Sequence, residues 1–150
     1  MSSVAIITAR GGSKRIPRKN IKPFCGKPII HYSIEAALES GLFDEVMVST
    51  DDAEIAEVAR KAGVAIPFMR SKQNSDDYAG TADVLIEVLQ EYKRQGQVFD
   101  SACCLYPTAP FVTAEKLLES KRAFEAGNYD TLFPVAAFSY PIQRALRKKE

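Results

Sequence analysis

The chain has 150 residues, 46% of them hydrophobic, and its 20 lysines and arginines against 19 aspartates and glutamates leave a net charge of +1. This length and composition predict one globular domain with an ordinary core, and the balanced charge argues against a general nucleic-acid or membrane-surface binder. No apolar run approaches the roughly 20 residues that span a bilayer. The apolar start is too short for a signal peptide, and the three cysteines form no C-x-x-C pair, so we expect buried free thiols in a cytoplasmic protein.

Short apolar segments alternate with amphipathic ones along the chain. In chain order, we predict a strand at 3–9, a helix at 28–40, a strand at 45–49, a helix that starts at 51 or 52 and ends at 63, a strand at 64–69, a helix at 81–95, a strand at 98–105, a helix at 113–127 and a strand at 130–138. Helices that separate short apolar strands are typical of the α/β class, in which a mainly parallel sheet carries helices on both faces.

Residues that favour helix ends mark the limits of these helices. Gly41 and Gly63 follow two of them, where a glycine closes the last turn. Asp51 or Asp52, Thr81 and Thr113 stand where a side-chain oxygen caps a first turn. Ligands of such sheets bind at the carboxyl ends of the strands, so four strand-end loops are candidate site segments: 10–27, 49–52, 70–81 and 106–113.

The first of these loops is strongly basic. Residues 10–27 contain seven lysines and arginines and no acid. Gly11 and Gly12 allow backbone N–H groups to approach an anion, and Ser13 adds a hydroxyl donor. The cations that can surround a triphosphate are Arg10, Lys14, Arg15, Arg18 and Lys19. Asn20 suits a ribose or sugar hydroxyl. The loop lacks the P-loop pattern. The alternative to an anion-binding role is that this segment is simply a basic loop exposed to solvent.

The other loops carry weaker signals. Ser49–Asp52 is explained by helix capping or by a ligand role. The polar segment from Arg70 to Thr81 is either a wall that reads a base or a simple connection, and the prolines of Tyr106–Pro110 suit a rigid pocket floor. His31, the only histidine, is expected to be structural or on the surface. Covalent nucleophilic catalysis has no supporting motif.

Four segments together carry a resemblance to a known family. Ala9–Ile21 reads A-R-G-G-S-K-x-x-P-x-K-N-I, Ser49–Asp52 reads S-T-D-D, Arg70 begins a polar loop that ends at Thr81, and Tyr106–Pro110 reads Y-P-T-A-P. In this order and spacing they resemble the cytidylyltransferases that activate nonulosonic (sialic-type) acids, the acylneuraminate cytidylyltransferase family. The segment 141–146, P-I-Q-R-A-L, is similar to one subgroup, the pseudaminic acid cytidylyltransferases.

The resemblance implies a Rossmann-like fold of the nucleotide-diphospho-sugar transferase type. It also implies a reaction in which the sugar's anomeric hydroxyl attacks the α-phosphate of CTP, giving a CMP-sugar and pyrophosphate, with Mg²⁺ present. By position, the phosphates and ribose would be held by Arg10, Gly11, Gly12, Ser13, Lys14, Lys19 and Asn20. Arg10 and Lys19 would be catalytic by offsetting charge on the α-phosphate and pyrophosphate.

The remaining implied roles concern the base and the sugar. Arg70 and Thr81 would frame the cytosine, and Tyr106 and Gln143 would face the sugar. Tyr106 stands where many members have Gln, which predicts a different nonulosonic acid, with pseudaminic acid preferred and N-acetylneuraminic acid as the alternative.

The family's metal-binding carboxylates come from a later segment. We therefore expect the Mg²⁺ ligands beyond residue 150, no metal ligand within the chain, and residues 1–150 to be the N-terminal nucleotide-binding part of a longer homodimeric enzyme. This part alone could be inactive. The alternative is a non-catalytic nucleotide-binding or assembly module.

Overall fold

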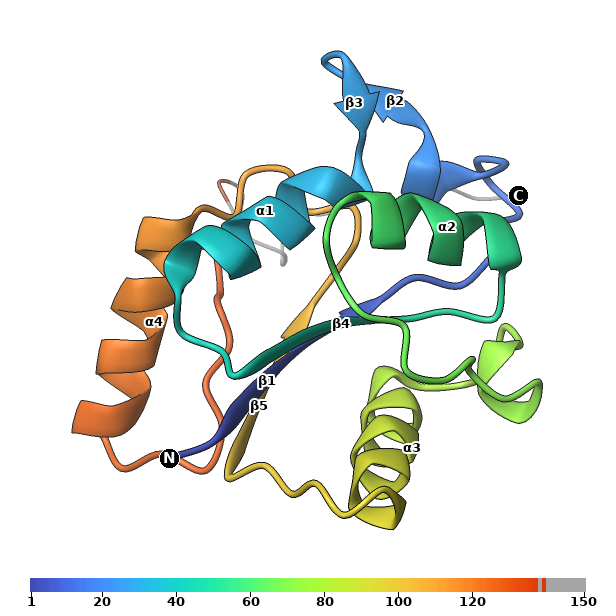
Figure 1. Cartoon of the computed structure of the whole chain (residues 1–150). Coiled ribbons are helices and arrows are strands. Elements are labelled where there is room, and N and C mark those ends of the chain that lie inside the picture. Colours follow the sequence, from blue (N-terminus) through green and yellow to red (C-terminus); the bar gives the residue numbers. More distant parts are fainter. Residues whose placement is uncertain (138, 140–150) are drawn as a thin grey trace, which may run out of the picture.

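The computed structural model describes residues 1–137 and 139 and has a parallel three-stranded sheet at its centre. Strand β1 (Ser3–Thr8) lies between β4 (Glu45–Ser49) and β5 (Ser101–Leu105) and pairs in parallel with both (Figure 1). In register, Ile6 is opposite Met47 on one side and Cys104 on the other. Parallel strands need crossover connections, and helices supply them here.

The alternating side chains of β1 supply both hydrophobic cores. Ala5 and Ile7 pack in a cluster with α1 (Ile30–Ser40), α2 (Ala53–Lys61) and α4 (Ala114–Ala126). Val4 and Ile6 pack on the opposite face with α3 (Thr81–Arg94). In Figure 1, α3 lies on one side of the sheet and α1 and α2 lie on the other. The predicted α/β class, with helices on both faces, is confirmed.

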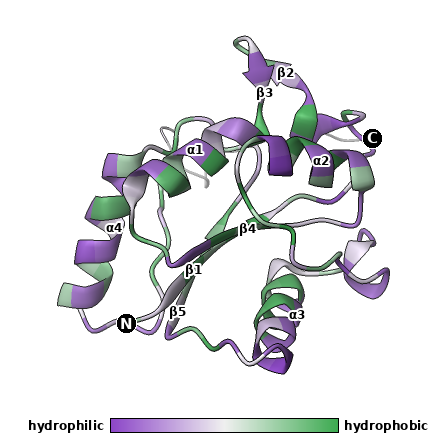
Figure 2. Ribbon diagram, in the orientation of Figure 1, coloured by the Kyte–Doolittle hydropathy of each residue, from purple (hydrophilic) through white to green (hydrophobic). Residues whose placement is uncertain are grey.

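The helices are amphipathic, as the sequence indicates. Green hydrophobic and purple hydrophilic residues alternate along α1 and α3 in Figure 2. On α3, Val88 and Tyr92 are buried, four residues apart on the side that meets the sheet. Each of these helices therefore packs one face on the sheet and leaves the other to solvent. No helix in the described part of the chain combines the length and apolarity that a membrane span requires.

Three of the predicted helix-end residues take the expected role, and one is displaced. Asp52 caps α2, Thr113 caps α4 and Gly41 ends α1 with φ 62°. Thr81, predicted as a cap, is instead the first residue of α3, because Gly80 takes the capping position and its N–H donates to the Asp83 carboxylate. The cap prediction was wrong by one residue.

Three predicted strands differ from the structure. Residues 64–69 make only one bridge, between Ala65 and Met47, because Pro67 has no N–H to extend a ladder. Strand β5 starts at Ser101 rather than at 98. Residues 130–137 form no strand: they pair with no strand of the sheet, and apolar side chains among them, such as Phe133 and Val135, are exposed. Residue 138 lies outside the described part.

The basic loop contains structure that the sequence did not predict. A short 3₁₀ helix, η1 (Lys19–Ile21), precedes a hairpin of β2 (Pro23–Phe24) and β3 (Lys27–Pro28), and α1 accordingly starts at Ile30 rather than at 28. A second 3₁₀ helix, η2 (Gln73–Ser75), lies in the 70–80 loop. At the hairpin turn, Cys25 and Gly26 have φ of 46° and 94°, the backbone that a two-residue turn requires. Cys25 is exposed, and Cys103 and Cys104 are half-buried, which corrects the expectation of buried free thiols.

Candidate functional site

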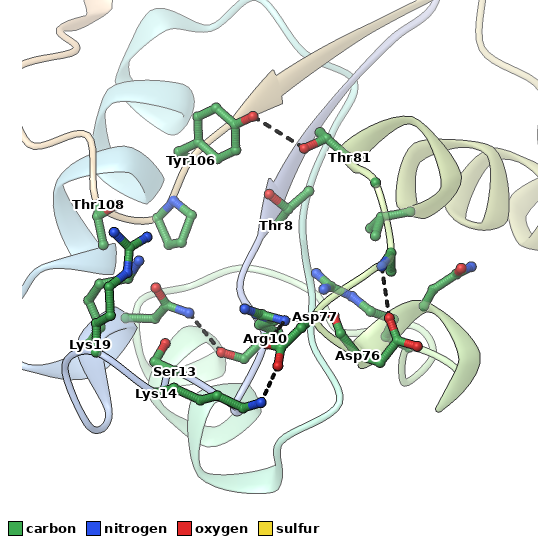
Figure 3. Close-up of a pocket in the computed structure, with 18 of the residues that line it drawn as sticks. Thr8, Arg10, Ser13, Lys14, Lys19, Asp76, Asp77, Thr81, Tyr106 and Thr108 are labelled. Atoms are coloured by element: carbon green, nitrogen blue, oxygen red, sulfur yellow. Dashed lines mark hydrogen bonds and ion pairs between the residues drawn. The ribbon is translucent and has the colours of Figure 1, made fainter. Parts of the chain in front are cut away.

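A pocket of about 750 Å³ opens at the carboxyl ends of β1 and β5 (Figure 3). Three segments far apart in the sequence line it: the basic loop, the 70–81 loop and the turn after β5. The predicted site residues that line it are Arg10, Ser13, Lys14, Lys19, Asn20, Arg70, Thr81 and Tyr106. Gly11 and Gly12 are outside the lining, and Gln143 falls outside the described residues.

Strand β1 delivers the basic loop to the pocket. The N–H of Ala9 donates to the carbonyl of Ser49 at 2.9 Å and extends the pairing by one residue, so that Arg10 emerges at the rim. Asn20 is 4% exposed, and its Nδ2 donates to the carbonyl of Arg10 at 2.8 Å. This bond closes the loop on itself and uses part of Asn20 for structure.

The 70–80 loop neutralises two of the pocket's cations. Arg10 Nη1 lies 2.9 Å from Asp77 Oδ1 and donates to the carbonyl of Asp76 at 2.6 Å. Lys14 also pairs with Asp77 (Figure 3). The ammonium of Lys14, and more weakly Arg10, lowers the pKa of Asp77 below its ordinary value. The sequence prediction missed both aspartates, although two acids in a loop that faces an acid-free loop were an available signal.

Lys19 and Arg15 complete the basic wall of the pocket. Lys19 is the first residue of η1 and is half-buried. Within residues 1–137 and 139, no carboxylate pairs with either side chain. Their charge is therefore available to an anion in the pocket.

Arg70 also lines the pocket, and its guanidinium is fixed by hydrogen bonds to Ser49. It is 8% exposed, its Nε donates to Ser49 Oγ at 3.0 Å, and its Nη2 donates to the Ser49 carbonyl at 2.6 Å. Burial lowers the pKa of its guanidinium, which Asp51 and Glu87 partly offset. These contacts tie the start of the 70–80 loop to the end of β4.

Tyr106 and Thr81 face each other across the other side of the pocket. The Tyr106 hydroxyl and Thr81 Oγ1 are 3.2 Å apart (Figure 3). The backbone of Tyr106 is fixed because Ser33 Oγ, fully buried, donates to its carbonyl at 2.8 Å. Tyr106 as a whole is 58% exposed. A rigid backbone thus presents a large polar-tipped ring to the pocket.

Two predicted phosphate-loop contacts have protein partners instead. The N–H of Gly11 donates to Asp51 Oδ1 at 2.8 Å. Arg18, named among the cations around a triphosphate, turns away from the pocket and pairs with Asp52 and Glu54. The S-T-D-D segment therefore contacts the basic loop itself, in addition to capping α2.

The described residues do not suit a magnesium ion. They contain no group of three or more histidine, cysteine, aspartate or glutamate side chains that could hold a metal. The two carboxylates at the pocket are already in use: Asp76 Oδ1 accepts from the N–H groups of Tyr78 and Ala79, and Asp77 pairs with Arg10 and Lys14.

The chain is similar to known proteins in sequence and in fold. Residues 4–143 match the sequence profile described as cytidylyltransferase. The chain belongs to the cytidylyltransferase family. A solved structure of CMP:2-keto-3-deoxy-manno-octonic acid synthetase, complexed with CTP, superposes with a TM-score of 0.71 at 25% identity over 85% of this chain and 49% of that one.

Among curated cytidylyltransferases, the pseudaminic acid cytidylyltransferase of Campylobacter jejuni subsp. jejuni serotype O:2 is 50% identical over all 150 residues, which span 65% of that protein. The CMP-N,N'-diacetyllegionaminic acid synthase of Legionella pneumophila subsp. pneumophila is 39% identical over 78% of this chain and 50% of that protein. The chain thus spans about two thirds or less of the length of these two relatives.

Proposed function

We propose that this chain forms the nucleotide-binding part of a CTP-dependent cytidylyltransferase whose acceptor is a nonulosonic acid, pseudaminic acid in preference to others. The observation that carries the proposal is the pocket in which Arg10, Lys14 and Lys19 lie on one side and Tyr106 with Thr81 on the other. Its basic side suits a triphosphate. The 50% identity to a pseudaminic acid cytidylyltransferase supports the choice of acceptor.

In the proposed reaction, the anomeric hydroxyl of the sugar acid attacks the α-phosphate of CTP, the bond to the β-phosphate oxygen breaks, and pyrophosphate leaves. The hydroxyl proton passes to solvent or to a phosphate oxygen. Such transfers depend on positioning and charge neutralisation more than on a protein nucleophile. Lys19 and Arg10 offset the charge that develops on the α-phosphate and on pyrophosphate. Ser13, Asn20 and Lys14 complete the contacts to phosphates and ribose.

The base and the sugar occupy the remaining walls. Arg70 and Thr81 frame the cytosine, and Tyr106 faces the sugar acid. Gln143 is the second proposed sugar contact and lies outside the described residues. Mg²⁺ is the proposed divalent ion, with ligands outside the 150 residues, and the proposed assembly of the full-length protein is a homodimer.

The decisive experiment measures pyrophosphate release with CTP, Mg²⁺ and each of two acceptors, pseudaminic acid and N-acetylneuraminic acid, for a full-length version and for the 150-residue chain. We expect turnover by the full-length protein with pseudaminic acid to exceed that with N-acetylneuraminic acid. Equal or faster turnover with N-acetylneuraminic acid would contradict the preference for pseudaminic acid and make N-acetylneuraminic acid the proposed acceptor. CTP binding without turnover in either version would instead support the second candidate, a non-catalytic nucleotide-binding module.

A further inference from the structure

One ion pair outside the pocket joins the basic loop to the start of α2. Arg18 Nη1 donates to Asp52 Oδ2 at 2.6 Å and Arg18 Nη2 donates to Asp52 Oδ1 at 2.9 Å. Nη2 also pairs with Glu54. Two parallel N–H···O bonds fix orientation as well as distance. Neither Arg18 nor Asp52 lines the pocket, so the proposed reaction has no direct use for them.

Asp52 is itself held by the first turn of α2. Its Oδ1 accepts the N–H groups of Glu54 and Ile55, both at 3.0 Å, and its own N–H donates to Thr50 Oγ1 at 3.2 Å. Thr50 is 0% exposed and Ile55 is 1% exposed. The carboxylate is therefore a rigid anchor rather than a mobile surface group.

Arg18 holds an unusual backbone immediately before the proposed catalytic lysine. Its φ of 55° and ψ of 29° lie in the left-handed region, and it precedes η1, which starts at Lys19. A residue other than glycine stays in this region only where its surroundings hold it there. The paired hydrogen bonds to Asp52 restrain the Arg18 side chain at this point, directly before Lys19.

The beginning of the basic loop contacts the same segment, Asp51 and Asp52. The N–H of Gly11 donates to Asp51 Oδ1 at 2.8 Å. A Cβ added at Gly11 would lie only 2.7 Å from Asp52 Oδ2, so the glycine backbone lies directly against this carboxylate. Asp51 and Asp52 thus hold the loop at two points, at its start beside Arg10 and near its middle beside Lys19.

We infer that Asp52 and Arg18 are positioning residues, which hold Arg10 and Lys19 of the basic loop in the geometry that binds phosphate. The inference rests on the proposed function, because it assigns a purpose to that geometry. It makes a prediction opposite to that of simple electrostatics. Removing a negative charge near an anion site should strengthen anion binding, whereas losing a positioning carboxylate should weaken it.

The substitution Asp52→Ser tests this sign. Serine retains an oxygen that can cap α2 but is too short to reach the Arg18 guanidinium. Titration calorimetry with tripolyphosphate should show binding about tenfold weaker, the effect of one misplaced charge-assisted contact. The melting temperature should fall by only a few degrees. The matched control is Glu57→Gln, which removes the same charge from an exposed position on α2 and should leave the affinity unchanged. Unchanged or tighter binding by Asp52→Ser would overturn the inference.

A double-mutant cycle tests whether the two residues act as a pair. Arg18→Met should also weaken tripolyphosphate binding, and adding Asp52→Ser to it should cause little further loss, because one interaction can be removed only once. Fully additive losses would contradict the pairing.

Hydrogen exchange separates this inference from the proposed function. In the ligand-free protein, the amides of Lys19 and Ile21 donate to the carbonyls of Ile16 and Arg18 at 3.2 and 3.1 Å. Asp52→Ser should speed their exchange, while exchange within β1 stays slow. Unchanged exchange at η1 would overturn positioning even if the wild-type chain binds tripolyphosphate. If the wild-type chain does not bind tripolyphosphate, but Asp52→Ser still speeds amide exchange at η1, the positioning role stands and only the proposed phosphate-binding role is removed.

Discussion

Asp77 and Arg10 form an ion pair across the mouth of the pocket, with Oδ1 and Nη1 2.9 Å apart. Asp77 comes from the 70–80 loop and Arg10 from the end of β1, 67 positions earlier in the chain. The same carboxylate pairs with Lys14. In the ligand-free structure an aspartate therefore occupies cations that the proposed function assigns to phosphates.

Replacing this aspartate should strengthen anion binding. In Asp77→Asn, Arg10 and Lys14 do not have to break ion pairs with a carboxylate before they bind phosphate. We therefore expect tripolyphosphate to bind about two- to fivefold more tightly, which is the scale of exposed ion pairs. Calorimetric titration at low and high salt measures the effect, which should shrink as salt screens the charges. The control is Glu119→Gln, which neutralises an exposed acid on α4 away from the pocket lining. Weaker binding by Asp77→Asn would mean that Asp77 organises the site rather than competing for it.

The two glycines that open the basic loop should respond differently to alanine. At Gly11 the new Cβ would lie 2.7 Å from Asp52 Oδ2 and 2.8 Å from Asp52 Cβ, whereas at Gly12 no atom lies within 4 Å. Neither residue has a positive φ. Gly11→Ala should therefore destabilise the fold by about 1–3 kcal/mol and weaken tripolyphosphate binding, while Gly12→Ala should change the free energy of unfolding by less than about 0.5 kcal/mol. Urea unfolding of both variants measures this difference. Equal effects would contradict the close approach at Gly11.

The core of this fold was predictable because its signals are local. The apolar run of β1 and the capping residues Asp52 and Thr113 act within a few positions of themselves. The strand expected at 64–69 does not form, because Pro67 lacks the backbone N–H donor that would extend its pairing. The β2–β3 hairpin was missed because Cys25-Gly26 is not a usual hairpin dipeptide, and tertiary context has to hold Cys25 at a positive φ.

The site was predictable as a set of positions but not as a set of contacts. Because parallel strands end at one edge of a sheet, loops that follow β1 and β5 had to meet, and this brings Arg10 and Tyr106 to one pocket. The sequence does not say which cations are already paired. Arg18 meets Asp52, 34 positions away, and Arg10 meets Asp77, and such pairings depend on how the loops pack in three dimensions.

The Arg18–Asp52 pair should also appear in the acid stability of the protein. The hydrogen bonds from Arg18, with the N–H groups of Ile55 and Glu54, lower the pKa of Asp52 from 3.8 to about 2. A depressed pKa in the folded state adds stability above the unfolded value of 3.8, and this contribution is lost as the pH falls towards 2. The pair is partly exposed to solvent, so the contribution is about 1 kcal/mol.

The difference in unfolding free energy between the wild-type chain and Asp52→Ser should therefore narrow from pH 4 to pH 2, the window bounded by these two pKa values. Urea titrations at several pH values in this range measure it. A constant difference would show that the lost stability comes from the helix cap rather than from the ionised carboxylate.

Tyr106 should influence which sugar acid is used. Its ring faces the pocket from a backbone fixed by Ser33. In a full-length version, Tyr106→Gln should shift the ratio of kcat/KM towards N-acetylneuraminic acid and away from pseudaminic acid. Tyr106→Phe keeps the ring and loses only the contact with Thr81, so it should keep the wild-type preference. An unchanged ratio in the glutamine variant would remove Tyr106 from the sugar site.

Lys19 should matter more to CTP than any other single lysine of the basic loop. It lines the pocket, and within the described residues its ammonium has no carboxylate partner. Since a charge-assisted contact contributes about 1.5–3 kcal/mol, Lys19→Ala should weaken CTP binding by about ten- to a hundredfold and lower turnover by a full-length version at least as much. The matched control is Lys22→Ala, in the same loop but exposed and outside the pocket lining. Both variants should melt close to the wild-type temperature, because neither side chain packs in the core. Equal CTP affinities for the two variants would mean that the loop attracts CTP through its overall charge and not through a contact made by Lys19.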